Sequence, residues 1–422
     1  MNTTITHLSL QRFLGSPYLS FSPKTISSKL NIQNSHFSQF GNSFLYSITR
    51  KISLNFNKVD FNNFQKNSII LNSEEKAQVS MATQYTDQIF PENETATFYR
   101  CHFINCKGDE TGGGAISCED NEFEINITKC VFAKCLVMNS TGGAIYVSKT
   151  RSFSISKSCF GQCTSELQAH TVYVNGNKKI INFEDDTFSE NGNTKVPDTI
   201  FTSEAITFLS RSNITSNKAS TGALGHYLNS QSLRLQENNF VENIGTTGIA
   251  HPNVSCNIDY TEEWTHNNIY FNKLEVFIHG HISLEIRNLY TYQNKFNFFF
   301  NCPTPSNVIF KGCNFDFGES GLKNKAVVER KIYDYRTDTL FNADNLQPHA
   351  FSHVAVDYCN PYNFRKPFTR ANKPVEYLNN LQIDNHPHII FFMGIFFICI
   401  LVIIYFLIGR RADVRLGMQR LY

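Results

Sequence analysis

Hydrophobic and polar positions recur along this chain with a period longer than that of any single helix or strand. An aromatic or aliphatic residue is followed three positions later by Asn or Cys, and this pair returns after 29, 28, 28, 26 and 26 residues. The residues between the pairs are rich in Phe, Ile, Val, Thr and Tyr, with Asn, Gly and Ser among them, which is typical of short strands and turns. A fixed period of strands without a helical repeat predicts an all-β parallel β-helix, or β-solenoid. The pairs are Phe103…Cys106, Phe132…Cys135, Phe160…Cys163, Phe188…Asn191, Ile214…Asn217 and Phe240…Asn243.

Stacking predicts where each repeated residue lies. Successive coils are separated by the strand spacing of about 4.7–4.9 Å, so equivalent residues form ladders along the axis. We expect one internal aromatic ladder, and one corner at which Asn side chains hydrogen-bond the neighbouring coil while Cys106, Cys135 and Cys163 fill the same position in the earlier coils. The aromatic ladder consists of Phe103, Phe132, Phe160, Phe188 and Phe240. The corner asparagines are Asn191, Asn217 and Asn243.

A second motif, Gly-Gly-Ala-Ile, occurs in register with the first, at Gly113, Gly114, Ala115 and Ile116 and at Gly142, Gly143, Ala144 and Ile145. The glycine pair supplies the positive φ that a second corner needs. The isoleucine then points inward from the next strand.

The two motifs together resemble the repeats of the chlamydial polymorphic outer membrane proteins and of related surface proteins of trichomonad protists. The resemblance covers about residues 95–250 and fades on both sides. It implies a right-handed parallel β-helix that is exposed at a cell surface and acts in adhesion. The bacterial members have a different membrane domain at the C-terminus, whereas this chain ends in an apolar segment, which favours the trichomonad membrane-anchored type.

That apolar segment predicts a single transmembrane helix at residues 389–408. The 20 residues carry no charge, and at about 1.5 Å each they span a hydrocarbon core of about 30 Å. The alternative is a buried core helix. Because four arginines follow the segment, the positive-inside rule places the tail, residues 409–422, in the cytoplasm and the repeats outside a plasma membrane.

The N-terminus gives less support to this topology. Met1–Ser20 has no apolar core of the length that a signal peptide needs. Three alternatives stay open: another start of translation, insertion directed by the C-terminal anchor, or repeats in the cytosol. Candidate glycosylation sequons favour the extracellular placement, and they lie at Asn93, Asn126, Asn139, Asn213 and Asn253.

The chain divides into five predicted parts. Residues 1–30 are expected to be poorly ordered, and residues 31–320 form the β-helix, with the clear repeats in 95–250. Residues 321–388 lose the period and gain prolines, so they are predicted to be an irregular cap and stalk, which solenoids need at their ends. The transmembrane helix, 389–408, and the cytoplasmic tail, 409–422, follow.

Twelve cysteines raise the question of metal or disulfide bonds. The chain has no C-x-x-C pair, and a separation of five positions is not a zinc spacing. Stacking brings cysteines of neighbouring coils within disulfide range, although buried free thiols remain the alternative. The candidates form two ladders, Cys106, Cys135 and Cys163 in one and Cys101 and Cys130 in the other. No metal or cofactor is expected.

Candidate chemistry is sparse. A net charge of +2 predicts no nucleic-acid surface. The acidic run Glu184-Asp185-Asp186 has no evident basic partner, so we interpret it as a solvated turn. We therefore predict a non-catalytic, membrane-anchored protein that recognises host cells, glycans or other surface proteins. The alternative is a carbohydrate-active enzyme of the pectate-lyase or glycoside-hydrolase type, which would need carboxylates that converge in one groove.

Overall fold

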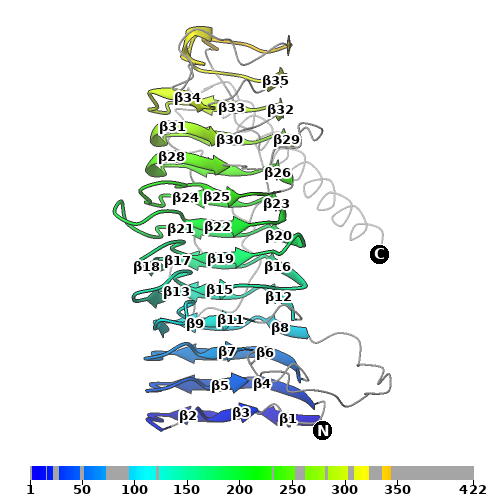
Figure 1. The fold of residues 1–422 in the computed structure, drawn as a ribbon, viewed down its shortest axis with the longest axis vertical. Coiled ribbons are helices and arrows are strands. Elements are labelled where there is room, and N and C mark those ends of the chain that lie inside the picture. The colour runs from blue at the N-terminus through cyan, green and yellow to red at the C-terminus, as the bar shows by residue number, and fades with distance from the viewer. Residues whose placement is uncertain are drawn as a thin grey trace, which may run out of the picture. The chain divides into compact units, whose positions relative to one another are not determined.

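The structure is a computed structural model that describes residues 2–15, 17–21, 28–47, 52–72, 95–119, 123–230, 232–251, 262–280, 284–302, 308–322 and 335–343. These residues form the predicted parallel β-solenoid, whose coils stack along one axis from β1 to β36 (Figure 1). The chain divides into two compact units, Met1–Lys366 and Pro367–Tyr422. The solenoid belongs to the first unit.

The strands form three rows and one short sheet, and neighbouring strands in each row pair in parallel. Row 1 contains β1 (Asn2–Thr6), β4 (Ser28–Ser38), β6 (Ile52–Asn62), β8 (Thr95–Tyr99), β12 (Glu124–Thr128), β16 (Ser152–Ser156), β20 (Ile180–Glu184), β23 (Ile206–Ser210), β26 (Ser232–Gln236), β29 (Glu262–Thr265), β32 (Leu284–Arg287), β35 (Val308–Lys311) and β36 (Tyr335–Thr337). Row 2 contains β2 (Ser9–Gln11), β9 (His102–Ile104), β13 (Val131–Ala133), β17 (Cys159–Gly161), β21 (Thr187–Ser189), β24 (Asn213–Thr215), β27 (Asn239–Val241), β30 (Asn268–Tyr270) and β33 (Tyr290–Tyr292). Because β4 and β6 run through both rows, rows 1 and 2 make one 22-stranded sheet among the described residues.

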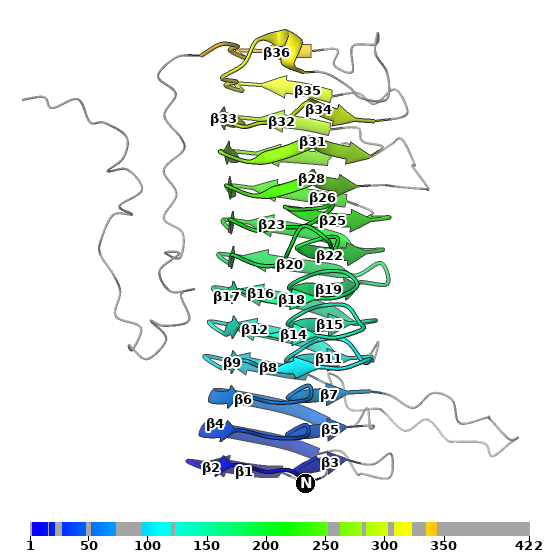
Figure 2. The same ribbon diagram turned by 90° about the vertical axis from the view of Figure 1, so that its left-hand side faces the viewer.

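Row 3 is a separate sheet of 11 described strands, on the right-hand side of Figure 2. It contains β3 (Leu19–Phe21), β5 (Leu45–Ser47), β7 (Ile69–Leu71), β11 (Ile116–Cys118), β15 (Ile145–Val147), β19 (Val172–Asn175), β22 (Ile200–Ser203), β25 (Gly225–Leu228), β28 (Ile244–His251), β31 (Lys273–Gly280) and β34 (Phe298–Asn301). The short sheet contains β10 (Lys107–Gly108), β14 (Leu136–Val137) and β18 (Thr164–Ser165), and a 3₁₀ turn, η1, spans Glu319–Gly321.

The aromatic ladder occupies the interior of row 2. The rings of Phe103, Phe132, Phe160 and Phe188 stack with centroid separations of 4.8, 4.7 and 4.8 Å and are nearly parallel. Phe240 is buried at the same position, and its neighbours in register are isoleucines. Each ring therefore fills the space between two coils, which is how a repeat of one strand-facing residue becomes a continuous core.

The glycine pairs serve two different purposes. Gly113 and Gly142 have φ of 65° and 70°, in the left-handed region. Gly114 and Gly143 instead allow close approach of the coils, because a Cβ would lie 2.4 Å from the carbonyl oxygen of Gly143 and 2.0 Å from that of His170. The prediction assigned positive φ to both residues of each pair, whereas the second residue is required for space.

The solenoid reaches further toward the N-terminus than predicted. Residues 1–30 were expected to be poorly ordered, but β1 pairs in register with β4 over five residues, and β2 and β3 pair with β4 and β5. The repeat motif is not visible there, because Leu10 takes the ladder position in register with Phe37 and is followed three positions later by Phe13. Backbone pairing with the next coil does not require the motif.

No helix in the described ranges is both long and apolar enough to cross a membrane. The predicted span, residues 389–408, and the predicted tail, residues 409–422, lie outside the described residues. The same holds for most of the predicted cap and stalk.

Candidate functional site

Asparagines build one corner of the solenoid, between rows 2 and 3. The side-chain amide of Asn217 donates to the carbonyl oxygen of Phe188 at 2.8 Å, and its Oδ1 accepts from the backbone N–H of Asn191 at 3.0 Å. The pattern repeats coil after coil through Asn243, Asn272 and Asn294. These polar contacts satisfy backbone groups that the turn would otherwise bury without partners.

The cysteines at this corner donate hydrogen bonds to backbone carbonyl oxygens through their thiols, as the asparagines do through their amides. The Sγ atoms of Cys135 and Cys163 donate to the carbonyl oxygens of Phe103 and Phe132, each at 3.5 Å. Cys101, Cys106, Cys130, Cys135 and Cys163 are all buried free thiols, so the disulfides considered for these two ladders are not formed and the alternative of buried thiols describes them. Burial raises the pKa of the Cys135 thiol, which makes it a weak nucleophile.

The acidic run is not the solvated turn that its sequence suggested. Asp186 is fully buried and accepts hydrogen bonds from the backbone N–H groups of Ser158 and Glu184 at 2.8 and 3.1 Å. Burial raises the pKa of Asp186 well above its usual value. Arg211, from the next coil, pairs with Glu184 and with Asp185, so the expectation that the run lacks a basic partner was wrong. The run therefore stabilises a corner.

The described sequons differ in exposure. Asn139 is exposed in a turn, with φ of 54°. Asn126 is partly buried and donates to Glu124 at 2.9 Å, while Asn213 is 8% exposed and accepts from Asn239 at 2.8 Å. Asn93 and Asn253 lie outside the described residues.

The outer face of row 3 carries an aromatic ladder of its own. The rings of Tyr146, Tyr173 and Phe201 stack at 5.2 and 4.8 Å. Because each ring covers the face of the next, no broad aromatic face is left for a sugar ring to stack on. We therefore assign this ladder to packing between coils.

One buried carboxylate lies next to that ladder. Asp198 has φ of 65° and is fully buried, and its Oδ2 atom lies 3.0 Å from Nδ1 of His226 and 2.8 Å from Nε2 of Gln168. The carboxylate therefore fixes the orientation of the imidazole. Nε2 of His226 is buried without a hydrogen-bond partner, so it faces no described group to which it could pass a proton.

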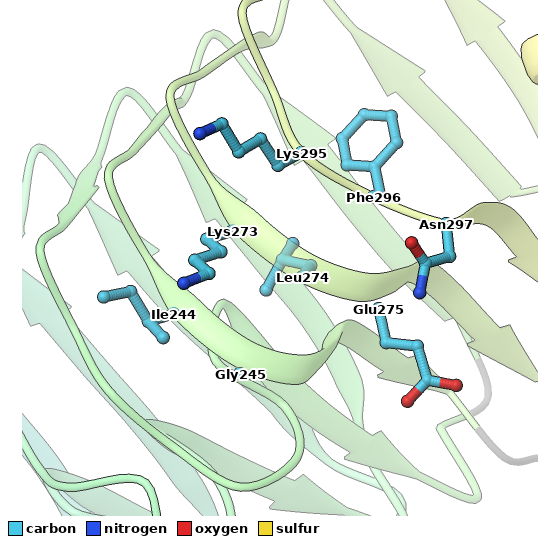
Figure 3. A pocket seen from close by; sticks show the side chains of 8 residues that line it. All are labelled: Ile244, Gly245, Lys273, Leu274, Glu275, Lys295, Phe296 and Asn297. Atoms are coloured by element: carbon cyan, nitrogen blue, oxygen red, sulfur yellow. The ribbon is translucent and has the colours of Figure 1, made fainter.

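A groove of about 440 Å³ lies on three successive coils, just after the asparagine corner (Figure 3). Lys273 and Lys295 stand at one side of it and Leu274 and Phe296 line it with apolar surface, while Glu275 and Asn297 lie together at the far side. Gly245 lets two coils approach closely, because a Cβ there would lie 2.6 Å from the carbonyl oxygen of Ala219. The lining residues are Ile244, Gly245, Lys273, Leu274, Glu275, Lys295, Phe296 and Asn297.

The lysines of the groove belong to a column that follows the asparagine ladder by one residue. Lys218, Ile244, Lys273 and Lys295 pair in register from coil to coil. Lys273 and Lys295 are exposed, and neither ammonium group is in an ion pair with a described carboxylate. Adjacent coils place their backbones about 4.8 Å apart, so the groove presents two lysine side chains from neighbouring coils beside the partly exposed ring of Phe296.

Sequence reasoning missed this groove, although a signal for it exists. Each lysine directly follows a ladder asparagine, so the dipeptide Asn-Lys at 217–218, 272–273 and 294–295 marks a column of charge on the outside of the corner. Among the described residues no three His, Cys, Asp or Glu side chains are close enough to hold a metal ion.

Comparison with protein-family models, with curated proteins and with solved structures found no match to this chain. The resemblance noted in the sequence therefore rests on its two repeat motifs alone. The groove and the repeat geometry are the grounds for inferring function.

Proposed function

We propose that this protein is a membrane-anchored, non-catalytic β-helix of the cell surface that recognises acidic surface glycans. The observation that carries the proposal is the groove with Lys273 and Lys295 over Leu274 and Phe296. Apolar surface with a few charged groups at its edge is typical of ligand sites. A carboxylate or sulfate on a sugar would pair with the two ammonium groups, while the apolar face of the sugar ring covers the phenylalanine.

Two features of the sequence support the surface location. The uncharged stretch 389–408, followed by arginines, has the length and flanking charge of a single membrane span. The repeat motifs resemble those of adhesins with a right-handed helix, and crossovers between parallel strands are right-handed in about 98% of cases. An epitope placed after Tyr422 should react with antibody only after cells are permeabilised, and reaction on intact cells would contradict this orientation.

The alternative, a carbohydrate-active enzyme, would require more carboxyl groups in the groove. Cleavage of a glycosidic bond by the usual mechanism requires two carboxyl groups that flank the bond. Glu275 is the one carboxylate among the lining residues of the described groove. Release of reducing or unsaturated sugar by the wild-type protein that stops in Glu275→Gln would favour the enzyme over the adhesin.

Binding can be tested with the full-length protein displayed on cells. Fluorescent polygalacturonate should bind more tightly than its neutral methyl ester, and binding should weaken as salt is added. The double variant Lys273→Ala/Lys295→Ala should lose at least about tenfold in affinity, or about 1.4 kcal/mol. Lys218→Ala is the matched control, because Lys218 lies in the same column but outside the groove. Equal effects of the control and the double variant would refute the groove as the site.

A further inference from the structure

The corner between rows 1 and 2 carries positive side chains on four successive coils, those of β6, β8, β12 and β16 (Figure 1). The residues just before the corner pair in register from coil to coil, and they are Asn57, Tyr99, Thr128 and Ser156. The residues that follow them are therefore stacked as well. We call these the basic column, which consists of Lys58, Arg100, Lys129 and Lys157.

The four residues of the basic column share one backbone conformation. Their φ angles are 54°, 55°, 55° and 54°, in the left-handed region. The backbone N–H of Arg100 donates to the carbonyl oxygen of Thr128 at 3.0 Å, and that of Lys129 donates to Ser156 at 2.9 Å. Because conformation and pairing are the same in each coil, the side chains leave the corner on the same side, about 4.7–4.9 Å apart at the backbone.

The described carboxylates near the column have other partners. Asp60, two residues after Lys58, pairs with two histidines at 2.8 and 3.6 Å. Asp185, one coil beyond Lys157, pairs with Arg211 at 2.8 Å. No member of the basic column is in an ion pair with a described carboxylate. Two of the four side chains are exposed and two are partly exposed, so their charges are available to a ligand.

One aromatic ring orients two of these cations. The guanidinium carbon of Arg100 lies 5.2 Å from the centroid of the Tyr99 ring, and Nζ of Lys129 lies 5.7 Å from it. A cation over the face of an aromatic ring is attracted to it. The two side chains therefore lose part of their freedom before any ligand binds, which lowers the entropic cost of binding.

The row 1 face beside the column is rich in hydroxyl and amide groups. Buried and partly exposed positions alternate along its strands, so every second residue points outward. The outward residues of β8 and β16 are Thr95, Thr97, Tyr99, Ser152, Ser154 and Ser156. Those of β6 before the corner and of β12 are Ser, Thr or Asn, except Glu124. Such side chains both donate and accept hydrogen bonds, which suits a partner rich in hydroxyls.

The positive charge is confined to one line along the axis. The row 2 positions next to the column are Asp60, His102, Val131 and Cys159, and none of them is a lysine or an arginine. A lipid surface is bound by a cluster of basic residues spread over a face, whereas a single line of charge matches a linear polymer. A polymer of uronic acids carries one carboxylate on each sugar, with hydroxyls between the carboxylates.

We propose that the basic column and the hydroxyl-rich face beside it form a second binding site, which holds a linear acidic polysaccharide along the solenoid axis. Anionic groups of the polymer pair with cations of successive coils, while its hydroxyls hydrogen-bond the side chains of row 1. The proposal rests on the proposed function for the class of ligand. It does not rest on the lysine groove, which lies after another corner and on other coils.

Binding should be measured with the full-length protein displayed on cells, in the Lys273→Ala/Lys295→Ala background, so that the groove lysines do not contribute. Fluorescent polygalacturonate should still bind, and adding Lys129→Gln/Lys157→Gln should weaken this binding at least about tenfold. Lys129→Arg/Lys157→Arg, which keeps both charges, should not. The matched control is Lys178→Gln/Lys179→Gln, which removes two exposed lysines outside the column and changes the net charge equally.

The length of the ligand gives an independent readout. Because the column spans four coils, affinity should rise from the digalacturonate to an oligomer of about four sugars, and Lys129→Gln/Lys157→Gln should remove that rise. Absence of residual binding in the groove background, or equal losses in the column variant and the Lys178/Lys179 control, would overturn the column. Binding to phosphatidylcholine vesicles that contain phosphatidylserine, without binding to polygalacturonate, would also overturn it. If instead the groove variant binds like the wild type and the column variant does not, the groove fails as the site and the column stands.

Discussion

Replacement of one ladder asparagine should reveal how much the amide corner contributes to stability. Asn217 is fully buried and bridges two neighbouring coils. Its Nδ2 donates to the carbonyl oxygen of Phe188 at 2.8 Å, and its Oδ1 accepts from the backbone N–H of Asn191 at 3.0 Å. In Asn217→Ala both backbone groups lose these partners inside the protein, where water does not replace them.

The magnitude follows from those two groups. Each buried polar group that loses its partner costs about 1–3 kcal/mol, so Asn217→Ala should lower the free energy of unfolding by about 2–6 kcal/mol. Asn217→Cys should cost less, because the thiols of Cys135 and Cys163 donate to the equivalent carbonyl oxygens, those of Phe103 and Phe132. The order of stability should be Asn, then Cys, then Ala.

Native-state hydrogen exchange is the suitable assay, because solenoid coils open locally and not in one step. The amide of Asn191 should exchange much faster in Asn217→Ala, and amides several coils away should change little. Asn297→Ala is the matched control, since Asn297 is exposed. An Asn217→Ala protein whose Asn191 amide is as protected as in the control would refute the reasoning.

Two further predictions concern the core and a buried ion pair. Phe132→Ala should lower the free energy of unfolding by about 3–5 kcal/mol through the cavity left between two stacked rings. In the same denaturant titrations Phe271→Ala, at an exposed site, should change it by less than about 0.5 kcal/mol. Similar losses in the two variants would contradict the ladder. Burial alone would lower the pKa of His251, but the charge and hydrogen bond of Glu262, 2.7 Å away, raise it. Because the pKa of His251 is raised in the folded state, the pair stabilises the fold fully below the unfolded pKa of 6.5. This stabilisation is lost as the pH rises through the folded pKa. The stability advantage of wild type over Glu262→Gln should therefore be largest below the unfolded value of 6.5 and shrink as the pH rises above it, and an advantage that grows with pH would contradict the pairing.

The ladders could be predicted because stacking gives equivalent residues equivalent surroundings. Phe132 sees Phe103 and Phe160 above and below, so the same side chain suits every coil and the sequence repeats it. The asparagine corner repeats for the same reason. The fold class and the identity of these residues can therefore be read from the spacing of Phe and Asn along the chain.

The corner between rows 1 and 2 could not be predicted. The same hydrogen bond recurs there in each coil, but the residue type that makes it changes. The residues that follow one another there are Cys130, Ser158, Asp186, Ser212 and Asn238. Each offers one acceptor to the backbone N–H of the coil before it, and thiol, hydroxyl, carboxylate and amide all do so. A repeat of one hydrogen bond that is made by different residue types cannot be found by looking for one repeated residue type. Asp186 was therefore interpreted as part of a solvated turn.

The division between inside and outside explains where function can reside on this solenoid. In the interior and at the corners, the ladders of Phe, Asn and Cys pack and hydrogen-bond one coil against the next. The outward positions differ from face to face: row 1 carries charged side chains such as Glu124, Glu184 and Arg234, the row 2 strands from β13 to β33 carry uncharged ones, and the column after the asparagine corner carries Lys218, Lys273 and Lys295. A ligand that follows the axis meets Lys218, Lys273 and Lys295 in one column, which Ile244 interrupts. Specificity for a repeating acidic polymer then requires only the right side chains on successive coils, which is why we locate recognition in the lysine groove and not in the repeated geometry of the core.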